Sequence, residues 1–184
     1  MSSSLSRDLL RQLDRYQTAD TDEMRMLEAM IEFVRTYSNC FDRSLAVGHV
    51  TGSAWIVDGR GTSALLTHHR KLNRWLQPGG HWDGDTSAFA IAKREAQEES
   101  GLTSLSPLST EIFDIDVHLI PERHSEPEHL HYDVRFIFKA NPTEAFTVSD
   151  ESRDLAWMSM REVTDMGDPS LIRMVEKTVK AVNP

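Results

Sequence analysis

The segment from Gly79 to Leu102 places three glutamates at the spacing of one helix face. Glu95, Glu98 and Glu99 stand at i, i+3 and i+4, so a helix brings their side chains together. Carboxylates at these spacings repel one another and destabilise an isolated helix by about 0.2–0.5 kcal/mol per pair. A bound cation would offset this repulsion, whereas a solvated face would tolerate it. The spacing alone leaves both interpretations open, a metal site and a solvated acidic face.

Residues that interrupt or end helices frame this segment on both sides. Gln77-Pro78-Gly79-Gly80 precedes it, and two adjacent glycines permit close approach of the backbone to a ligand. Asp85 or Thr86 can cap the N-terminus of the helix, and Gly101 is a typical C-terminal stop. We therefore expect a glycine loop that leads into an acidic helix.

The neighbouring segments change from helical to strand-like patterns. Residues 46–57 and 62–68 are joined by Asp58-Gly59-Arg60-Gly61, which is a strong hairpin signal. Residues 112–120 and 130–140 alternate apolar and polar side chains, and the polar loop between them allows antiparallel pairing. A short strand is also expected at residues 155–158. These segments predict a β-sheet beside the acidic helix.

One register of the second strand pair gathers polar side chains on a single face of the sheet. If Val117 lies opposite Tyr132, the facing pairs are Asp114 with Arg135, Asp116 with Asp133, and His118 with His131. The loop does not determine this register, so a solvated polar face is the alternative. A second polar or metal site would then involve His81, His118, His131, Asp116 and Asp133.

Further helices are expected at both ends of the chain. Residues 5–16 have helical spacing, and a clearer helix follows Asp20, which with Glu23 resembles a capping box. The second helix has a one-sided apolar stripe, which indicates core packing: Met24, Leu27, Met30, Ile31 and Val34. Ser159 with Glu162 signals a short helix, and Asp168-Pro169 opens a final one. We predict an α/β fold with a helical extension at residues 1–44 and a main domain at residues 45–184.

Composition restricts the classes of function. Charged residues make up 27% and hydrophobic residues 39% of the chain, which is typical of a globular protein. A net charge of −9 argues against an extended nucleic-acid-binding surface, although divalent cations can bridge acidic side chains to an anionic substrate. The single cysteine, Cys40, excludes an internal disulfide framework.

No apolar run approaches the length of a membrane span, and the N-terminal residues lack the apolar core of a secretory signal. We therefore expect a cytoplasmic enzyme, monomeric or homodimeric, that acts on a small-molecule substrate and binds no membrane.

Gly80 and the run from Arg94 to Leu102, REAQEESGL, resemble the signature of the Nudix hydrolase family. That signature is a glycine, five residues, a glutamate, seven residues, and then Arg-Glu-aliphatic-any-Glu-Glu-any-Gly-aliphatic. The distance from Gly80 to Arg94 matches it, and the resemblance extends over residues 45–184. One position departs, because the first glutamate of the signature falls on Thr86. Asp83 or Asp85 could supply the negative charge instead.

The resemblance implies an α/β/α sandwich with a mixed sheet. It also implies hydrolysis of a diphosphate bond in a nucleoside diphosphate linked to another group, with Mg²⁺ or Mn²⁺ as cofactor. Matching residues imply that Glu95, Glu98, Glu99 and the Gly79 carbonyl hold the metal and that Arg94 orients the neighbouring acidic residue. Such cations neutralise phosphate oxygens and lower the pKa of bound water.

Two further sets of residues are assigned on weaker grounds. Glu151 is our candidate for the general base, with a role in capping local backbone as the alternative. Arg70, Lys71 and Arg74 lie in a basic segment before the glycines, and with Gly80 they are candidate substrate-binding residues. A solvated loop is the alternative for the basic segment.

Two other functions remain as alternatives. The same fold hosts an isomerase class acting on isopentenyl diphosphate, which needs a catalytic cysteine and a histidine-rich metal site. Cys40 lies far in sequence from Gly79–Leu102, which counts against that class. A non-catalytic nucleotide-sensing module keeps the fold and loses the glutamates, whereas Glu95, Glu98 and Glu99 are all present here. Hydrolysis is the preferred prediction.

Overall fold

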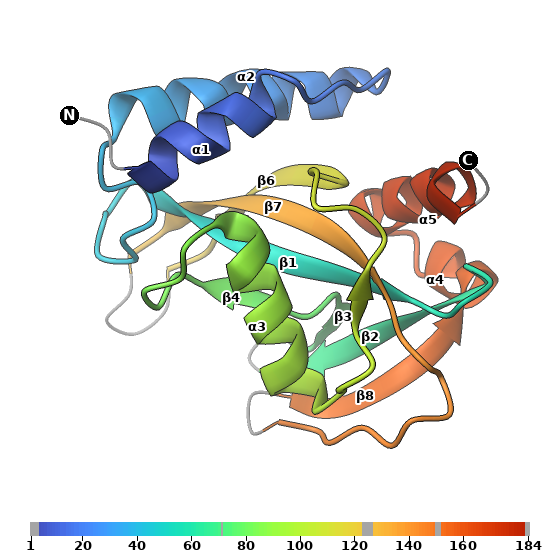
Figure 1. Ribbon diagram of the computed structural model, residues 1–184. Coiled ribbons are helices and arrows are strands. Elements are labelled where there is room, and N and C mark those ends of the chain that lie inside the picture. Colours follow the sequence, from blue (N-terminus) through green and yellow to red (C-terminus); the bar gives the residue numbers. More distant parts are fainter. Residues whose placement is uncertain (1–3, 71, 123–126, 150–151, 183–184) are drawn as a thin grey trace.

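The computed structural model describes residues 4–70, 72–122, 127–149 and 152–182. One mixed sheet runs through the molecule, with helices on both of its faces (Figure 1). The helices are α1 (Ser4–Leu13), α2 (Thr21–Thr36), α3 (Ala88–Ser100), α4 (Met160–Asp165) and α5 (Pro169–Val182). The strands are β1 (Gly48–Val57), β2 (Ser63–His69), β3 (Arg74–Leu76), β4 (Gly79–His81), β5 (Ser106–Pro107), β6 (Asp114–Ile120), β7 (His129–Lys139) and β8 (Ser152–Ser159).

Strand β1 is the centre of the sheet. It pairs in parallel with β7 over its whole length and antiparallel with β2 and β4. Strands β5 and β6 pair antiparallel with β7, and β3 and β8 pair antiparallel with β2. The predicted register of β6 and β7 is confirmed, because Val117 lies opposite Tyr132. The polar residues of these strands therefore share one face.

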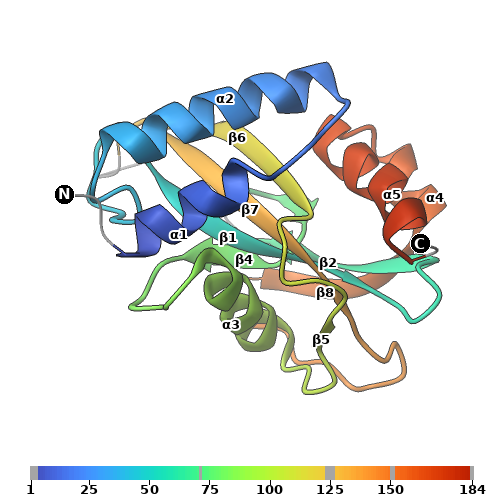
Figure 2. The ribbon, with the colours of Figure 1, turned by 45° about the horizontal axis from the view of Figure 1, so that its top comes forward.

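Successive side chains of β1 and β7 point to opposite faces of the sheet, and each face packs into its own hydrophobic core. Val50, Ala54 and Phe136 belong to the core that also contains buried residues of α1, α2 and α3. Trp55 and Ile137 face the other way and pack with residues of α4 and α5. Figure 2 shows α1, α2 and α3 on one side of the sheet and the pair α4 and α5 on the other. The predicted α/β/α arrangement is confirmed.

The two N-terminal helices share the core with the sheet. Phe33 of α2 stacks on Tyr132 of β7, with ring centroids 3.9 Å apart. The predicted apolar stripe is correct at Met30 and Val34, which are buried, and wrong at Met24, whose exposed fraction is 45%. The boundary between an extension and a main domain at residue 45 stays a prediction.

The caps show where local sequence rules apply. Ser159 and Glu162 form the predicted capping box of α4, and Gly101 ends α3 with a φ of 69°. The N-cap of α3 is Ser87, whose side chain accepts a hydrogen bond from the Ala90 N–H, so Asp85 and Thr86 were the wrong candidates.

Among the described residues, no helix is both long enough and apolar enough to cross a membrane.

Candidate active site

Gly79 and Gly80, which were expected in a loop, begin strand β4 and lie where no side chain would fit. A Cβ atom on Gly79 would come 2.1 Å from Ser53 Oγ, and one on Gly80 would come 2.3 Å from Glu95 Oε1. Real Cβ atoms do not approach other heavy atoms so closely. Gly79 therefore lets β4 lie close to Ser53 of β1, and Gly80 lets the Glu95 side chain of α3 lie directly against the backbone of β4.

The three glutamates of α3 differ in their surroundings. Glu99 is buried and accepts a 2.8 Å hydrogen bond from the Gly79 N–H. The Glu95 side chain is 15% exposed and lies beside Gly80, whereas that of Glu98 is 59% exposed. The exposure of the three carboxylates thus increases from Glu99, which contacts Gly79, through Glu95 to Glu98, which is open to solvent.

Arg94 holds the acidic side chains in place. Its Nη1 donates to Glu95 Oε1 at 2.9 Å and to Glu98 Oε2 at 2.8 Å. Its Nη2 donates to the backbone carbonyl of His81 at 2.7 Å. A single guanidinium therefore joins two of the glutamates to the loop that follows the glycines.

Asp85 explains the departure from the signature at Thr86. Arg94 Nε lies 3.2 Å from both carboxylate oxygens of Asp85, and Nη2 lies 3.0 Å from Oδ2. Burial alone would raise the pKa of Asp85, but the hydrogen bonds from Arg94 and from the Asp83 N–H lower it. The same contact with Asp85 is the largest cause of the raised pKa of Arg94. A carboxylate one position before Thr86 thus binds the arginine.

The donor set on α3 suits a hard divalent cation. Glu95, Glu98 and Glu99 offer carboxylate oxygens, and Gly79 offers a carbonyl oxygen in the adjacent strand; Mg²⁺ and Mn²⁺ prefer such ligands. The assignment of these four residues as metal ligands stays a prediction, as do the catalytic roles of Arg94, Glu95 and Glu98.

The other predicted site residues lie elsewhere or outside the described residues. Arg70 Nη2 donates to the backbone carbonyl of Ser152 at 2.9 Å, and Arg74 forms an ion pair with Asp168. These contacts direct both side chains toward β8 and the start of α5. Lys71 and Glu151 lie outside the described residues. The substrate-binding roles of Arg70, Lys71 and Arg74, and the role of Glu151, stay predictions.

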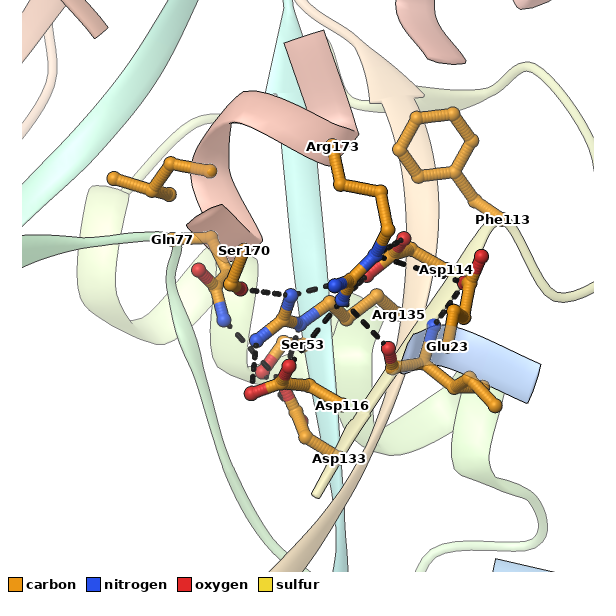
Figure 3. A network of polar contacts seen from close by, with 12 residues as sticks. Glu23, Ser53, Gln77, Phe113, Asp114, Asp116, Asp133, Arg135, Ser170 and Arg173 are labelled. Carbon is orange, nitrogen blue, oxygen red and sulfur yellow. Dashed lines mark hydrogen bonds and ion pairs between the residues drawn. The ribbon is translucent and has the colours of Figure 1, made fainter. Parts of the chain in front are cut away.

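A buried network of charges occupies the polar face of β6 and β7 (Figure 3). The Arg135 side chain, only 3% exposed, binds Asp133 at 2.8 Å, Asp114 at 3.0 Å and Asp116 at 3.2 Å. Burial alone would lower the pKa of Arg135, but these three carboxylates raise it. The predicted pairing of Asp114 with Arg135 is confirmed, and it belongs to a larger group of ion pairs.

Helices α2 and α5 extend this network. Arg173 of α5 donates to both oxygens of Asp114, at 2.8 and 2.9 Å. Lys177 of α5 lies 2.7 Å from Asp114 and pairs with the buried Glu23 of α2. Asp20 is the N-cap of α2, as predicted, and accepts a hydrogen bond from the Glu23 N–H. The Glu23 carboxylate was predicted to complete a capping box, and instead it accepts from Tyr16, Thr18 and Lys177. The sequence offered no local signal for this role, because helical spacing predicts an ordinary first-turn acid.

The carboxylates of the expected second site are thus bound largely by arginine. Asp133 accepts hydrogen bonds from the Thr51 and Ser53 hydroxyls at 2.9 and 2.7 Å, besides that from Arg135. Asp116 binds Arg135 and Arg173, and its Oδ2 also lies 3.0 Å from His118 Nδ1. His118 in turn lies beside His131, which belongs to a group of histidines near the start of β1 and β7.

That group includes two histidines, His49 and His129, for which the sequence predicted no role. His49 of β1 lies opposite His131 of β7, and their ring centroids are 4.7 Å apart. His129 precedes His131 by two positions, so strand alternation was a signal that could have placed it on the same face. Burial, with a smaller effect of neighbouring imidazoles, lowers the pKa of His49 to about 3 and that of His131 to about 2.

Comparisons with known proteins agree with this geometry. A family model described as "NUDIX domain" matches residues 48–178. A MutT protein structure from Methanosarcina mazei Go1 is 19% identical, with a TM-score of 0.55 over 76% of this chain and 99% of that chain. A Nudix hydrolase from M. smegmatis, RenU, is 20% identical, with a TM-score of 0.54 over 74% and 89% of the two chains.

A binary complex of an Ap4A hydrolase from C. elegans is 16% identical, with a TM-score of 0.53 over 71% of this chain and 95% of that chain. No curated protein matches the sequence. The structural similarities show the fold, and the family match agrees with the prediction of a pyrophosphohydrolase. The chain belongs to the Nudix family.

Proposed function

We propose that this protein hydrolyses a diphosphate bond in a nucleoside diphosphate linked to another group, with Mg²⁺ or Mn²⁺ as cofactor. One observation carries the proposal: α3 brings Glu95, Glu98 and Glu99 together beside the glycine loop, with Arg94 bound to two of them. Membership of the Nudix family supplies the general reaction, cleavage of a pyrophosphate bond.

Each residue has a role that its contacts support. Glu95, Glu98, Glu99 and the Gly79 carbonyl would hold the cation, which would neutralise phosphate oxygens and lower the pKa of bound water. Arg94 positions Glu95 and Glu98 through its Nη1. The Gly79 N–H fixes the orientation of the Glu99 carboxylate. Phosphoryl transfer depends mainly on such positioning and on charge stabilisation.

Substrate binding is assigned to Gly80, Arg70, Lys71 and Arg74. Because Gly80 has no side chain, a phosphate could approach its backbone closely. Arg70 and Arg74 would have to exchange their contacts with Ser152 and Asp168 for contacts with the substrate. Glu151 remains our candidate for the general base.

The surroundings of Cys40 argue against the isomerase alternative. Its side chain is buried, with Sγ 3.5 Å from the hydroxyl of Ser6 in α1. Burial also raises the pKa of this thiol, which disfavours the reactive thiolate. We therefore interpret Cys40 as a residue that packs in the core. A measurement of hydrolytic activity distinguishes an enzyme from the non-catalytic alternative.

The experiment is a substrate screen with Mg²⁺ and with Mn²⁺. Nucleoside triphosphates, nucleotide sugars and dinucleoside polyphosphates would be offered, the last because an Ap4A hydrolase has a similar fold. We expect turnover of at least one class, lost in Glu98→Gln and retained in Glu28→Gln, a matched change on the exposed surface of α2. Absence of turnover with every class, or full activity of Glu98→Gln, would reject the proposal.

A further inference from the structure

Five imidazole rings gather where strands β1, β4, β6 and β7 come together. His131 lies at the centre, with ring centroids 4.7 Å from His49, 5.1 Å from His81, 5.2 Å from His129 and 5.5 Å from His118. Strand pairing produces this group, since His131 lies opposite His49 on one side and opposite His118 on the other.

Three of these residues have the arrangement of metal ligands. His49, His129 and His131 each offer a ring nitrogen, and these atoms all lie within 4.8 Å of one another. Around a tetrahedral ion with metal–nitrogen distances of about 2.0–2.1 Å, the nitrogens would lie roughly 3.4 Å apart. Binding an ion would therefore draw the three nitrogens closer together than they lie in this structure.

Two of these three residues have ring nitrogens without a partner within the part of the chain that the structure describes. Both ring nitrogens of His49, whose exposed fraction is 2%, and Nε2 of His131 are buried without a hydrogen bond. Buried polar atoms in proteins nearly always have a partner, so unpaired nitrogens in neighbouring imidazole rings call for a ligand.

A hydrogen bond at Nδ1 of His129 leaves its other ring nitrogen, Nε2, available to a metal ion. Its Nδ1 lies 2.8 Å from the backbone carbonyl of Pro127. A carbonyl only accepts hydrogen bonds, so Nδ1 carries the proton and Nε2 of the neutral ring keeps its lone pair. Ligating histidines typically have such a bond from the nitrogen that faces away from the metal.

We propose that His49, His129 and His131 form a binding site for a divalent transition-metal ion, with Zn²⁺ as the type case. Imidazole nitrogens select Zn²⁺ and similar ions, whereas Mg²⁺ prefers oxygen ligands. The site is therefore chemically distinct from the carboxylates of α3. His81, whose ring centroid lies 4.9 Å from that of His49, flanks the ion.

An ion at this position would connect neighbouring strands of the sheet. His49 is in β1 and His131 is in β7, so the ion would join these two parallel strands near their starts. It would also hold His129 at the point where the chain enters β7. His81 links this region to the glycine loop, because its backbone carbonyl accepts a hydrogen bond from Arg94.

The test measures metal binding and requires no catalytic activity. Untagged full-length protein would be stripped with EDTA and dialysed against Zn²⁺ or Co²⁺ in excess Mg²⁺, and the retained ion would be counted. We expect one retained transition-metal ion per chain, and for Co²⁺ a visible absorption band of a nitrogen-ligated ion. His131→Ala and His129→Ala should each weaken binding at least tenfold, and His68→Ala on β2 should not.

Further controls separate the outcomes. His129 is only partly buried, so its substitution tests the site if His131→Ala fails to fold. Glu98→Gln should lose hydrolysis and retain the transition metal, which keeps this proposal independent of the proposed function. Retention of no ion in the presence of Mg²⁺, or equal retention in wild type and in folded His129→Ala, would overturn the proposal.

Discussion

Arg94 and Asp85 form a two-pronged ion pair, with Nε and Nη2 of the arginine 3.0–3.2 Å from the aspartate carboxylate. The pair lies between the glycine loop and α3, and the Asp85 side chain is only 10% exposed. Nη1 of the same arginine binds Glu95 and Glu98. Asp85 is therefore a positioning residue for the candidate metal ligands.

Replacing Asp85 should impair catalysis through geometry. We expect Asp85→Ala to lower kcat by about 10- to 100-fold with a smaller change in KM, because a small displacement of reacting groups has effects of this size. Adding Thr86→Glu should restore part of the loss, since it places a carboxylate at the position used in the signature. Steady-state kinetics would check this, with Asp83→Asn as the control. An unchanged kcat in Asp85→Ala would contradict the role.

Gly80→Ala should abolish turnover and leave the fold intact. The added Cβ would lie 2.3 Å from Glu95 Oε1, so the carboxylate must move away. Gly59→Ala is the matched control, because a Cβ there meets nothing within 4 Å. Circular dichroism would establish folding, and the assay for the best substrate would measure activity. Equal activity of the two variants would show that the contact between Gly80 and Glu95 is dispensable.

Arg135→Met should destabilise the protein strongly. It leaves Asp114 and Asp133 buried with fewer partners, and breaking a buried ion pair costs about 3–5 kcal/mol. Arg161→Met removes a pair whose arginine side chain is 90% exposed, so its effect should stay below about 1 kcal/mol. Denaturant unfolding of both variants provides the measurement. Similar midpoints would mean that the network contributes no stability.

Acid should destabilise the protein partly through Asp114. Burial alone would raise the pKa of Asp114, but Arg173, Arg135 and Lys177 lower it. The folded state then binds this proton less readily than the unfolded state, whose pKa is about 3.9. The contribution is complete above the unfolded value and is lost as the pH falls below about 4. Unfolding free energies from pH 7 to 3 should fall less steeply in Asp114→Asn than in wild type or in the exposed control Asp165→Asn.

Residues 1–44 should be needed for a stable fold. Phe33 stacks on Tyr132, and Glu23 pairs with Lys177 of α5, so deletion exposes apolar surface and removes one carboxylate from the buried network of charges. We expect a chain that begins at residue 45 to lose at least several kcal/mol of stability or to aggregate. Thermal unfolding would measure this. An unchanged Tm would support an independent domain at residues 45–184.

The register of β6 and β7 shows what periodicity can predict. Alternation assigns Val117 and Tyr132 to the apolar face, and shifting either strand by one residue would reverse its faces, so only registers that keep both apolar faces together suit a buried core. The same reasoning predicted the helix that carries Glu95 and its stop at Gly101. The N-cap position was wrong because Asp85, Thr86 and Ser87 are all acceptable caps, and Asp85 instead binds Arg94.

Local pattern thus determined the longer strands, the main helices and the face of α3 that carries the glutamates, since these depend on residues a few positions apart. It did not predict the short strands β3, β4 and β5, which exist through pairing with distant strands. Only the tertiary structure decided which distant residues meet. The parallel pairing of β1 with β7 brings His49 to His131, and the positions of α2 and α5 around the sheet bring Glu23 to Lys177. Spacing cannot encode such contacts, because they depend on how whole elements pack around the two cores.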